Sequence, residues 1–188
     1  MELRVWKSDV LVVLRLKAVG FAYMFNEDHP IGRKAEGIAV KYLLDRHKAL
    51  KVFEMDGLEY AEFDMIAVFK RGKVRTCEIK ADYKEKLTGN IAIEIRHKGY
   101  FSGILVSQAD WYIIILTDKL LCMKKRDLFY FLRENEFREI QWEGDMSTII
   151  LVPTDELICS GICDIYDYKE KKVIEEVVNG KTPLHEFA

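Results

Sequence analysis

Three charged side chains, Asp64, Glu78 and Lys80, stand in two stretches of sequence that otherwise have the composition of strands. Residues 59–69 and 74–81 are rich in apolar residues, and the basic sequence KRGK separates them as a turn. Because strand side chains alternate between two faces, Glu78 and Lys80 project from the same face of the second strand. Asp64 lies on the neighbouring strand, so this hairpin can bring two carboxylates and one ammonium together.

Two carboxylates and a cation at one point are suited to metal-dependent hydrolysis of a phosphodiester. Mg²⁺ binds hard oxygen ligands, commonly one or two carboxylates, with water and phosphate completing its shell. Asp64 and Glu78 supply such oxygens, and the backbone carbonyl of Ile79 can add a third. Lys80 would lie beside the metal, where an ammonium stabilises charge developing on the phosphate or orients the attacking water. A plain ion pair between Glu78 and Lys80 on a strand surface is the alternative interpretation.

A helix upstream of the hairpin carries a fourth charged candidate, Glu36. Apolar residues recur at positions 35, 38, 39, 42 and 43, the spacing of an amphipathic helix, after a break that contains Pro30 and Gly32. If this helix packs over the sheet, it can aim Glu36 at the same metal site as Asp64. An acidic residue near a helix start also interacts favourably with the helix dipole, which is the alternative explanation.

The rest of the chain predicts further strands and helices around the same sheet. Apolar runs predict strands at 51–56, 90–95, 109–116 and 147–153, and amphipathic patterns predict helices at 124–135, at 154–162 and in a terminal stretch ended by Gly180. For residues 2–24 the sequence fits either a strand or a short helix that starts after Ser8. The order of these elements predicts one mixed α/β domain built around a central sheet.

Glu36 on a first helix, followed by Asp64 and by the tripeptide EIK at 78–80, resembles the pattern of the PD-(D/E)XK nuclease superfamily. Within it, "GRKAEGIAVKYLL" and "AEFDMIAVFKRGKVRTCEIKAD" are most similar to archaeal and viral Holliday junction resolvases and related phage nucleases. The resemblance covers residues 32–82 well and continues loosely to about residue 135. The proline that gives the motif its name is missing, as in many members of the superfamily.

The resemblance implies a restriction-endonuclease-like core, in which a central mixed β-sheet is flanked by helices. It also implies that Asp64, Glu78 and Ile79 hold Mg²⁺, for which Mn²⁺ can substitute. Glu36 would contact the metal directly or through water, and Lys80 would be the catalytic lysine. The expected activity is Mg²⁺-dependent endonucleolytic cleavage of branched or duplex DNA. Because resolution of a junction needs two symmetric cuts, a homodimer is expected.

Two other functions are compatible with the same residues. The chain can be a viral or phage exonuclease, or a restriction-type nuclease, that acts on linear DNA. From a different class, it can be a non-catalytic DNA-binding protein with a nuclease fold, although retention of all four charged positions argues against this. No segment resembles a base-reading module, which favours selectivity for DNA structure over sequence.

Further candidates for substrate contact lie outside the four charged positions. Basic clusters suited to the phosphate backbone comprise Lys70, Arg71, Lys73, Arg75, Arg96, His97 and Lys98, with Lys124, Lys125 and Arg126 at a predicted helix start. Each cluster is equally compatible with a solvated turn or helix end. Similarity of "NIAIE", "SG" and "ADW" to phage nucleases of the superfamily implies an additional group near the substrate, namely Asn90, Glu94, Ser102 and Ser107.

The 188 residues are long enough for one nuclease domain with a single core. We expect a core at about 31–153, an N-terminal extension at 1–30 and an acidic C-terminal extension at 154–188. No apolar run approaches the roughly 20 residues of a membrane span, and no signal peptide pattern opens the chain, so we expect a cytoplasmic protein, in a host cell if it is viral. The pair Cys159 and Cys163 fits either core thiols or a disulfide.

Overall fold

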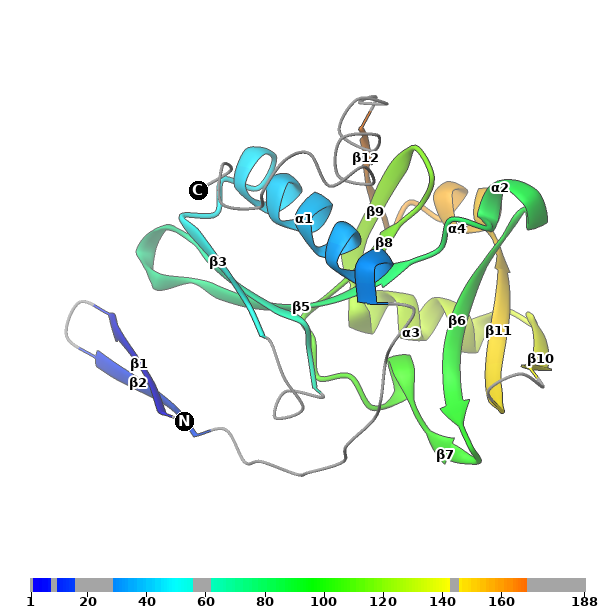
Figure 1. Ribbon diagram of the computed structural model, residues 1–188, viewed down its shortest axis with the longest axis horizontal. Coiled ribbons are helices and arrows are strands. Elements are labelled where there is room, and N and C mark those ends of the chain that lie inside the picture. The colour runs from blue at the N-terminus through cyan, green and yellow to red at the C-terminus, as the bar shows by residue number, and fades with distance from the viewer. Residues whose placement is uncertain (1, 8–9, 16–28, 56–61, 143–145, 169–188) are drawn as a thin grey trace.

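The computed structural model describes residues 2–7, 10–15, 29–55, 62–142 and 146–168 (Figure 1). Its central sheet has six strands in the order β12-β9-β8-β5-β4-β3. In chain order these are β3 (Lys51–Glu54), β4 (Met65–Val68), β5 (Val74–Ala81), β8 (Trp111–Ile115), β9 (Lys119–Lys124) and β12 (Asp164–Asp167). The strands β5 and β8 pair in parallel and the other neighbours are antiparallel, which confirms the expected mixed sheet.

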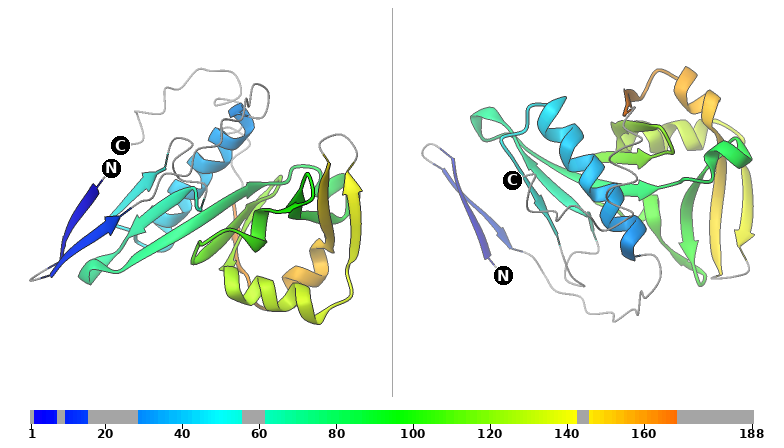
Figure 2. Two further views of the ribbon diagram at one scale, coloured as in Figure 1. Left: turned by 90° about the horizontal axis from the view of Figure 1, so that it is seen from below. Right: turned by 45° about the horizontal axis from the view of Figure 1, so that its top comes forward.

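A second, four-stranded antiparallel sheet lies beside the first (Figure 2). It has the order β10-β11-β6-β7, with β6 (Asn90–His97), β7 (Tyr100–Phe101), β10 (Arg138–Trp142) and β11 (Ser147–Pro153). The short helix α2 (Glu85–Thr88) joins β5 to β6, and the 3-10 turn η2 (Gly103–Leu105) follows β7. The described chain therefore changes from one sheet to the other directly after the predicted ExK strand.

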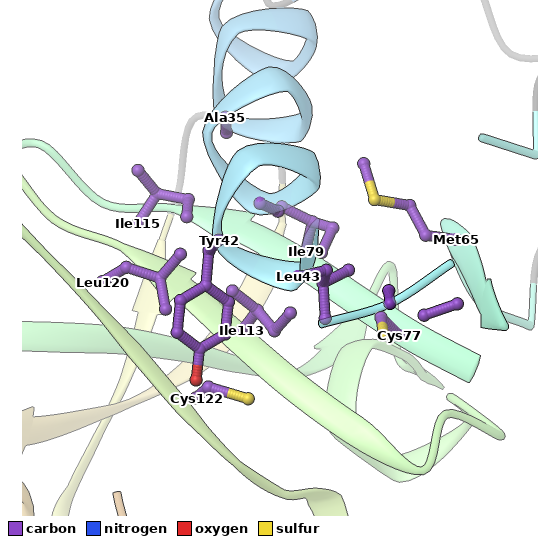
Figure 3. Packing of buried hydrophobic residues seen from close by; sticks show 13 residues of the cluster. Ala35, Tyr42, Leu43, Met65, Cys77, Ile79, Ile113, Ile115, Leu120 and Cys122 are labelled. Atoms are coloured by element: carbon purple, nitrogen blue, oxygen red, sulfur yellow. The ribbon is translucent and has the colours of Figure 1, made fainter. Parts of the chain in front are cut away.

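Helices cover both faces of the six-stranded sheet (Figure 2). Helix α1 (His29–Asp45) covers one face, and its buried residues Ala35, Tyr42 and Leu43 share a core with Cys77 and Ile79 of β5 (Figure 3). A second core on the other face contains residues of β8, of β6, of α3 (Lys125–Glu134) and of α4 (Thr154–Cys159). Its members include Tyr112, Ile114, Ile91, Ile93, Ile95, Leu128 and Leu157. The two faces of β5 consequently have different neighbours, and this fixes where its charged residues project.

Several element boundaries differ from the sequence-based expectation. Helix α1 begins at His29, so Pro30 and Gly32 lie in its first turn instead of a preceding loop; proline is tolerated there because first-turn amides have no partner in the helix. Residues 2–7 and 10–15 form the antiparallel pair β1 (Glu2–Lys7) and β2 (Val10–Arg15), so the strand alternative holds for these residues. Strands β7, β9, β10 and β12 were not predicted. The predicted terminal helix lies outside the described residues.

The sequence KRGK at the end of β4 forms a tight turn, as predicted, which includes the 3-10 turn η1 (Lys70–Gly72). Cys159 and Cys163 are free thiols and do not form the disulfide; Cys159 is exposed and Cys163 is half-buried, so they are not the buried core thiols of the first alternative either. In the part of the chain that the structure describes, no helix combines the length and apolar character that a membrane span requires.

Candidate active site

Asp64 is fixed against β5 by both its backbone and its side chain. Its amide donates a hydrogen bond to the carbonyl of Cys77 at 2.9 Å, and its Oδ2 accepts one from the amide of Ile79 at 2.6 Å. Asp64 stands immediately before β4, so its carboxylate replaces a carbonyl in the ladder between the two strands. The structure therefore places Asp64 next to β5, the strand that carries Glu78 and Lys80, as the sequence predicts.

Glu78 is buried, with only 7% of its surface exposed, and both of its carboxylate oxygens have partners. Lys80 Nζ lies 2.7 Å from Oε1, and Ser107 Oγ donates a hydrogen bond to Oε2 at 3.1 Å. Burying a carboxylate is costly unless it is paired and hydrogen-bonded, which is the arrangement seen here. The pair of Glu78 and Lys80 thus joins a buried carboxylate to a lysine whose side chain is 44% exposed, so it differs from a fully solvated surface ion pair on the glutamate side only.

Negative charge dominates the interior of this cluster. Burial and the charge of Glu78 raise the pKa of Asp64, and these effects outweigh the opposing influence of Lys80 and of the Ile79 amide. Burial lowers the pKa of Lys80, but Glu78, Tyr112 and Asp64 together raise it above its usual value. Lys80 therefore stays protonated near neutral pH. A single ammonium does not fully compensate the two carboxylates, so a further cation would be stabilised beside them.

Replacing Asp64 by asparagine is expected to increase the free energy of unfolding at pH 7 in the presence of chelator. A carboxyl group whose pKa is raised on folding favours the folded state below its unfolded pKa, and this contribution is lost as the pH rises through the folded pKa. Asparagine mimics the neutral form and can still accept the hydrogen bond from Ile79. The stability difference between variant and wild type should therefore grow from about pH 4 towards neutral pH, as measured by urea denaturation.

The matched control for this prediction is Asp118→Asn. Burial raises the pKa of Asp118, but its hydrogen bond with Lys86 and the charge of Lys119 lower it more. This exposed carboxylate should therefore favour folding at pH 7, and its removal should destabilise slightly. A loss of stability in Asp64→Asn that matches the control would show that the carboxylates of Asp64 and Glu78 do not repel each other.

The oxygen donors of this cluster suit Mg²⁺, which completes its coordination shell with water and substrate. They are too few for a metal ion that is coordinated by protein ligands alone. The described residues contain no group of three or more histidine, cysteine, aspartate or glutamate side chains placed to hold a metal ion. Asp64 and Glu78 are two carboxylates, and Mg²⁺ is typically bound by one or two of these, with water and substrate phosphate completing its shell. The residues that would hold it are Asp64, Glu78 and, through its carbonyl, Ile79.

The structure does not bring Glu36 together with the other three predicted residues. Helix α1 packs on the face of β5 formed by Cys77 and Ile79. Glu78 and Lys80 alternate with these residues and project from the opposite face. Glu36 is half-buried on α1, the helix that packs on the face of the sheet opposite to Glu78 and Lys80.

A second polar cluster surrounds Glu94 on β6. One Glu94 oxygen accepts a hydrogen bond from Ser102 Oγ, and the other accepts one from Ser147 Oγ at 3.0 Å. His97 Nδ1 lies 3.1 Å from the same Ser147 oxygen. Burial raises the pKa of Tyr112 against the opposing charge of Lys80, and the charges of Glu78, Asp64 and, least, Glu94 add to the increase.

The predicted additional residues thus divide between three places. Ser107 joins Glu78, whereas Ser102 joins Glu94. Asn90 lies at the other end of β6, about 13 Å from Glu94 at the usual rise per residue, where its side chain donates to the Thr88 carbonyl. Ser147 was missed by sequence reasoning, because a serine that opens an apolar strand carries no signal of its contact with Glu94.

The basic clusters lie at separate ends of the two sheets. Lys70, Arg71 and Lys73 are exposed around the turn η1, about 23 Å along β5 from Lys80 at the usual rise per residue. Arg75 lies 3.8 Å from Asp110, and both are partly exposed. At the start of α3, Lys124 and Arg126 lie within 4 Å of Asp127.

The arginine, histidine and lysine at positions 96–98 end β6 and begin the turn to β7. Arg96 is exposed and belongs to the strand that carries Glu94. Of the basic clusters, this one is therefore joined to the polar residues around Tyr112 by a short stretch of strand.

The chain matches no family model, no curated protein and no solved structure.

Proposed function

We propose that this protein is a Mg²⁺-dependent deoxyribonuclease with a PD-(D/E)XK-type centre at Asp64, Glu78 and Lys80. The observation that supports it most is the buried Glu78, which contacts Lys80 at 2.7 Å on the same strand face. Asp64, whose pKa is raised by burial and by Glu78, stands on the adjoining chain segment. Two close carboxylates with one protonated lysine match the requirements of phosphodiester hydrolysis.

The residues of this centre would have distinct roles in the reaction. Ser107 and the Ile79 amide hold the carboxylates of Glu78 and Asp64 in fixed orientations. Lys80, held beside Glu78 at 2.7 Å, would act by electrostatic stabilisation of the phosphate oxygens. A bound Mg²⁺ would lower the pKa of a water molecule and neutralise charge on the phosphate, and Mn²⁺ would serve as a substitute.

We further propose that the enzyme is an endonuclease selective for DNA structure, like Holliday junction resolvases, and that it acts as a homodimer. This finer assignment rests on the sequence resemblance over residues 32–82. Glu36 belongs to that resemblance as a metal-contacting residue, but its place on α1 gives this role no geometric support. The nuclease centre at Asp64, Glu78 and Lys80 does not depend on Glu36.

The test is incubation of the purified protein with a four-way junction and with linear duplex DNA, in Mg²⁺ and in chelator. We expect paired cuts near the branch point of the junction in Mg²⁺, little cleavage of the duplex, and no cleavage in chelator. Efficient cleavage of linear DNA would show that the protein is instead an exonuclease or a restriction-type nuclease. DNA binding with no cleavage of any substrate would assign a non-catalytic role.

A further inference from the structure

Strands β6 and β7 form a regular β-hairpin. His97 pairs with Tyr100 and Arg96 with Phe101, which leaves Lys98 and Gly99 as a two-residue turn. Both turn residues have positive φ, 50° at Lys98 and 82° at Gly99, as a type I′ turn requires. This turn matches the twist of the strands, so the side chains next to it are presented by a regular hairpin and not by an irregular loop.

Two consecutive aromatic side chains are exposed at the end of this hairpin. Tyr100 is 79% exposed and Phe101 is 65% exposed. Because neighbours on a strand project from opposite faces, the two rings lie on the two sides of the hairpin, and each adds exposed apolar surface of the kind found at binding sites. The Arg96 guanidinium lies 5.6 Å from the centroid of the Phe101 ring. The hairpin therefore offers flat apolar surfaces together with a cation.

A hollow of about 580 Å³ adjoins these aromatic rings. Strand pairing places Arg96 and Phe101 in one row with Thr148 of β11 and Gln141 of β10, and residues paired in this way share a face. The described residues that line the hollow include an arginine, an amide and a hydroxyl, but no acidic side chain. Its chemistry suits an anionic ligand with planar, hydrogen-bonding groups.

We propose that the β6–β7 hairpin stacks unpaired bases of the DNA substrate on Tyr100 and Phe101, while Arg96 contacts the adjoining phosphate. Aromatic side chains within a basic surface are the usual means by which proteins hold single-stranded nucleic acid without reading its sequence. Duplex DNA offers no free base faces along its length, so the hairpin would engage bases that open at the branch point of a junction or that extend as a single strand from a duplex. This inference rests on the proposed nuclease function and names the substrate class of that site.

The hairpin lies close enough to the candidate active site for both to engage one substrate. Arg96 follows Glu94 by two residues, a rise of about 7 Å along the strand. Ser102, which directly follows Phe101, donates a hydrogen bond to Glu94. Ser107 connects this region to the active site, because its amide donates to the carbonyl of Gly103, the residue after Ser102, and its Oγ donates to Glu78 at 3.1 Å. Unpaired bases held at the hairpin would thus lie beside the duplex segment that is cut.

The inference is tested by equilibrium DNA binding of the full chain in chelator, where no cleavage occurs. The probes are a fluorescein-labelled blunt duplex and the same duplex with a four-nucleotide single-stranded overhang that contains 2-aminopurine. We expect wild type to bind the overhang DNA more tightly than the blunt duplex and to change the 2-aminopurine fluorescence. The double variant Tyr100→Ala/Phe101→Ala should lose at least about fivefold in affinity for the overhang DNA and little for the duplex.

The matched control is Tyr130→Ala on α3. Tyr130 is also exposed and also has an arginine, Arg133, near its ring at 4.9 Å, but it belongs to a different surface. The control should bind both DNAs as wild type does. An unchanged overhang preference in the double variant, or no preference in wild type, would overturn the inference. A change of oligomeric state in the double variant, measured by sedimentation, would also overturn it by assigning the aromatic residues to a contact between copies of the chain.

Failure of this inference and failure of the proposed function give different results. If Mg²⁺-dependent cleavage occurs but overhang preference does not depend on the hairpin, only the stacking surface is wrong. If the overhang preference depends on the hairpin but no DNA is cleaved, the stacking surface stands and the nuclease assignment is wrong.

Discussion

Replacement of Lys80 by alanine is expected to reduce the rate of Mg²⁺-dependent DNA cleavage by about 100- to 1,000-fold, the usual effect of removing one preorganised electrostatic donor. Lys80 is the cation that contacts Glu78 at 2.7 Å and keeps its proton at neutral pH. Without it, charge developing on the phosphate has no fixed ammonium beside it. The measurement is a single-turnover cleavage rate with protein in excess over DNA.

Two further variants distinguish a loss of catalysis from a loss of folding. Lys80→Arg preserves a charged partner for the buried Glu78, so it should fold like wild type while recovering only part of the rate, because a guanidinium places its charge differently. Lys86→Ala removes a lysine that pairs with Asp118 at 3.1 Å on an exposed surface, and it should cleave normally. A folded Lys80→Ala protein that cleaves at the wild-type rate would exclude Lys80 from the reaction.

Substitution of Gly103 by alanine is expected to lower the free energy of unfolding by about 2–5 kcal/mol, because it combines backbone strain with a steric clash. Gly103 has a φ of +53°, and a Cβ there would lie 2.3 Å from the Glu94 carbonyl oxygen and 2.9 Å from its carbonyl carbon. These are backbone atoms of β6, so relief requires η2 to move away from the strand. Urea denaturation measures the loss.

The control for Gly103→Ala is Gly161→Ala. Gly161 has a comparable φ of +73°, but nothing lies within 4 Å of a Cβ built there. It should therefore lose only the strain of the left-handed conformation, about 1 kcal/mol. Gly103→Ala should also weaken overhang binding, because displacement of η2 disturbs Ser102 and the end of β7. Equal losses of stability in both variants would contradict the close approach of η2 to Glu94.

The strand that carries Glu78 and Lys80 could be predicted from sequence because its pattern is local. Alternation over residues 74–81 places the two charges on one face, whatever the rest of the fold does. The basic turn before it made the hairpin with β4 equally clear. The proximity of Asp64 follows from that hairpin, so the centre of the candidate site was accessible from a single stretch of sequence.

The placement of Glu36 was not accessible in the same way. The apolar stripe of α1 shows which side of the helix is buried, but it does not show which face of the sheet the helix covers. Both faces of β5 are apolar in part, with Cys77 and Ile79 on one and Tyr112 of β8 beside the other. The choice between the faces depends on long-range packing against the second core.

The separate four-stranded sheet also escaped sequence reasoning. Strand β10 is short and mostly exposed, with a single half-buried residue, Ile140, so it lacks the apolar run that marks a strand. In the six-stranded sheet, β9 follows β8 after only three residues, and its end overlaps the basic start of the predicted α3 helix, so it was not predicted either. Ser147 gained its role only when β11 paired with β6, a contact between segments about 50 residues apart.

The most direct test of the nuclease centre compares Glu78→Gln with Glu85→Gln in single-turnover cleavage of junction DNA in Mg²⁺. Both glutamates are buried, with 7% and 6% of their surfaces exposed, but Glu85 accepts its hydrogen bonds from Thr117, whereas Glu78 is paired with Lys80. We predict that Glu78→Gln loses cleavage while still binding the junction in chelator, and that a folded Glu85→Gln cleaves as wild type does. Cleavage by Glu78→Gln at the wild-type rate would contradict the assignment of the active site.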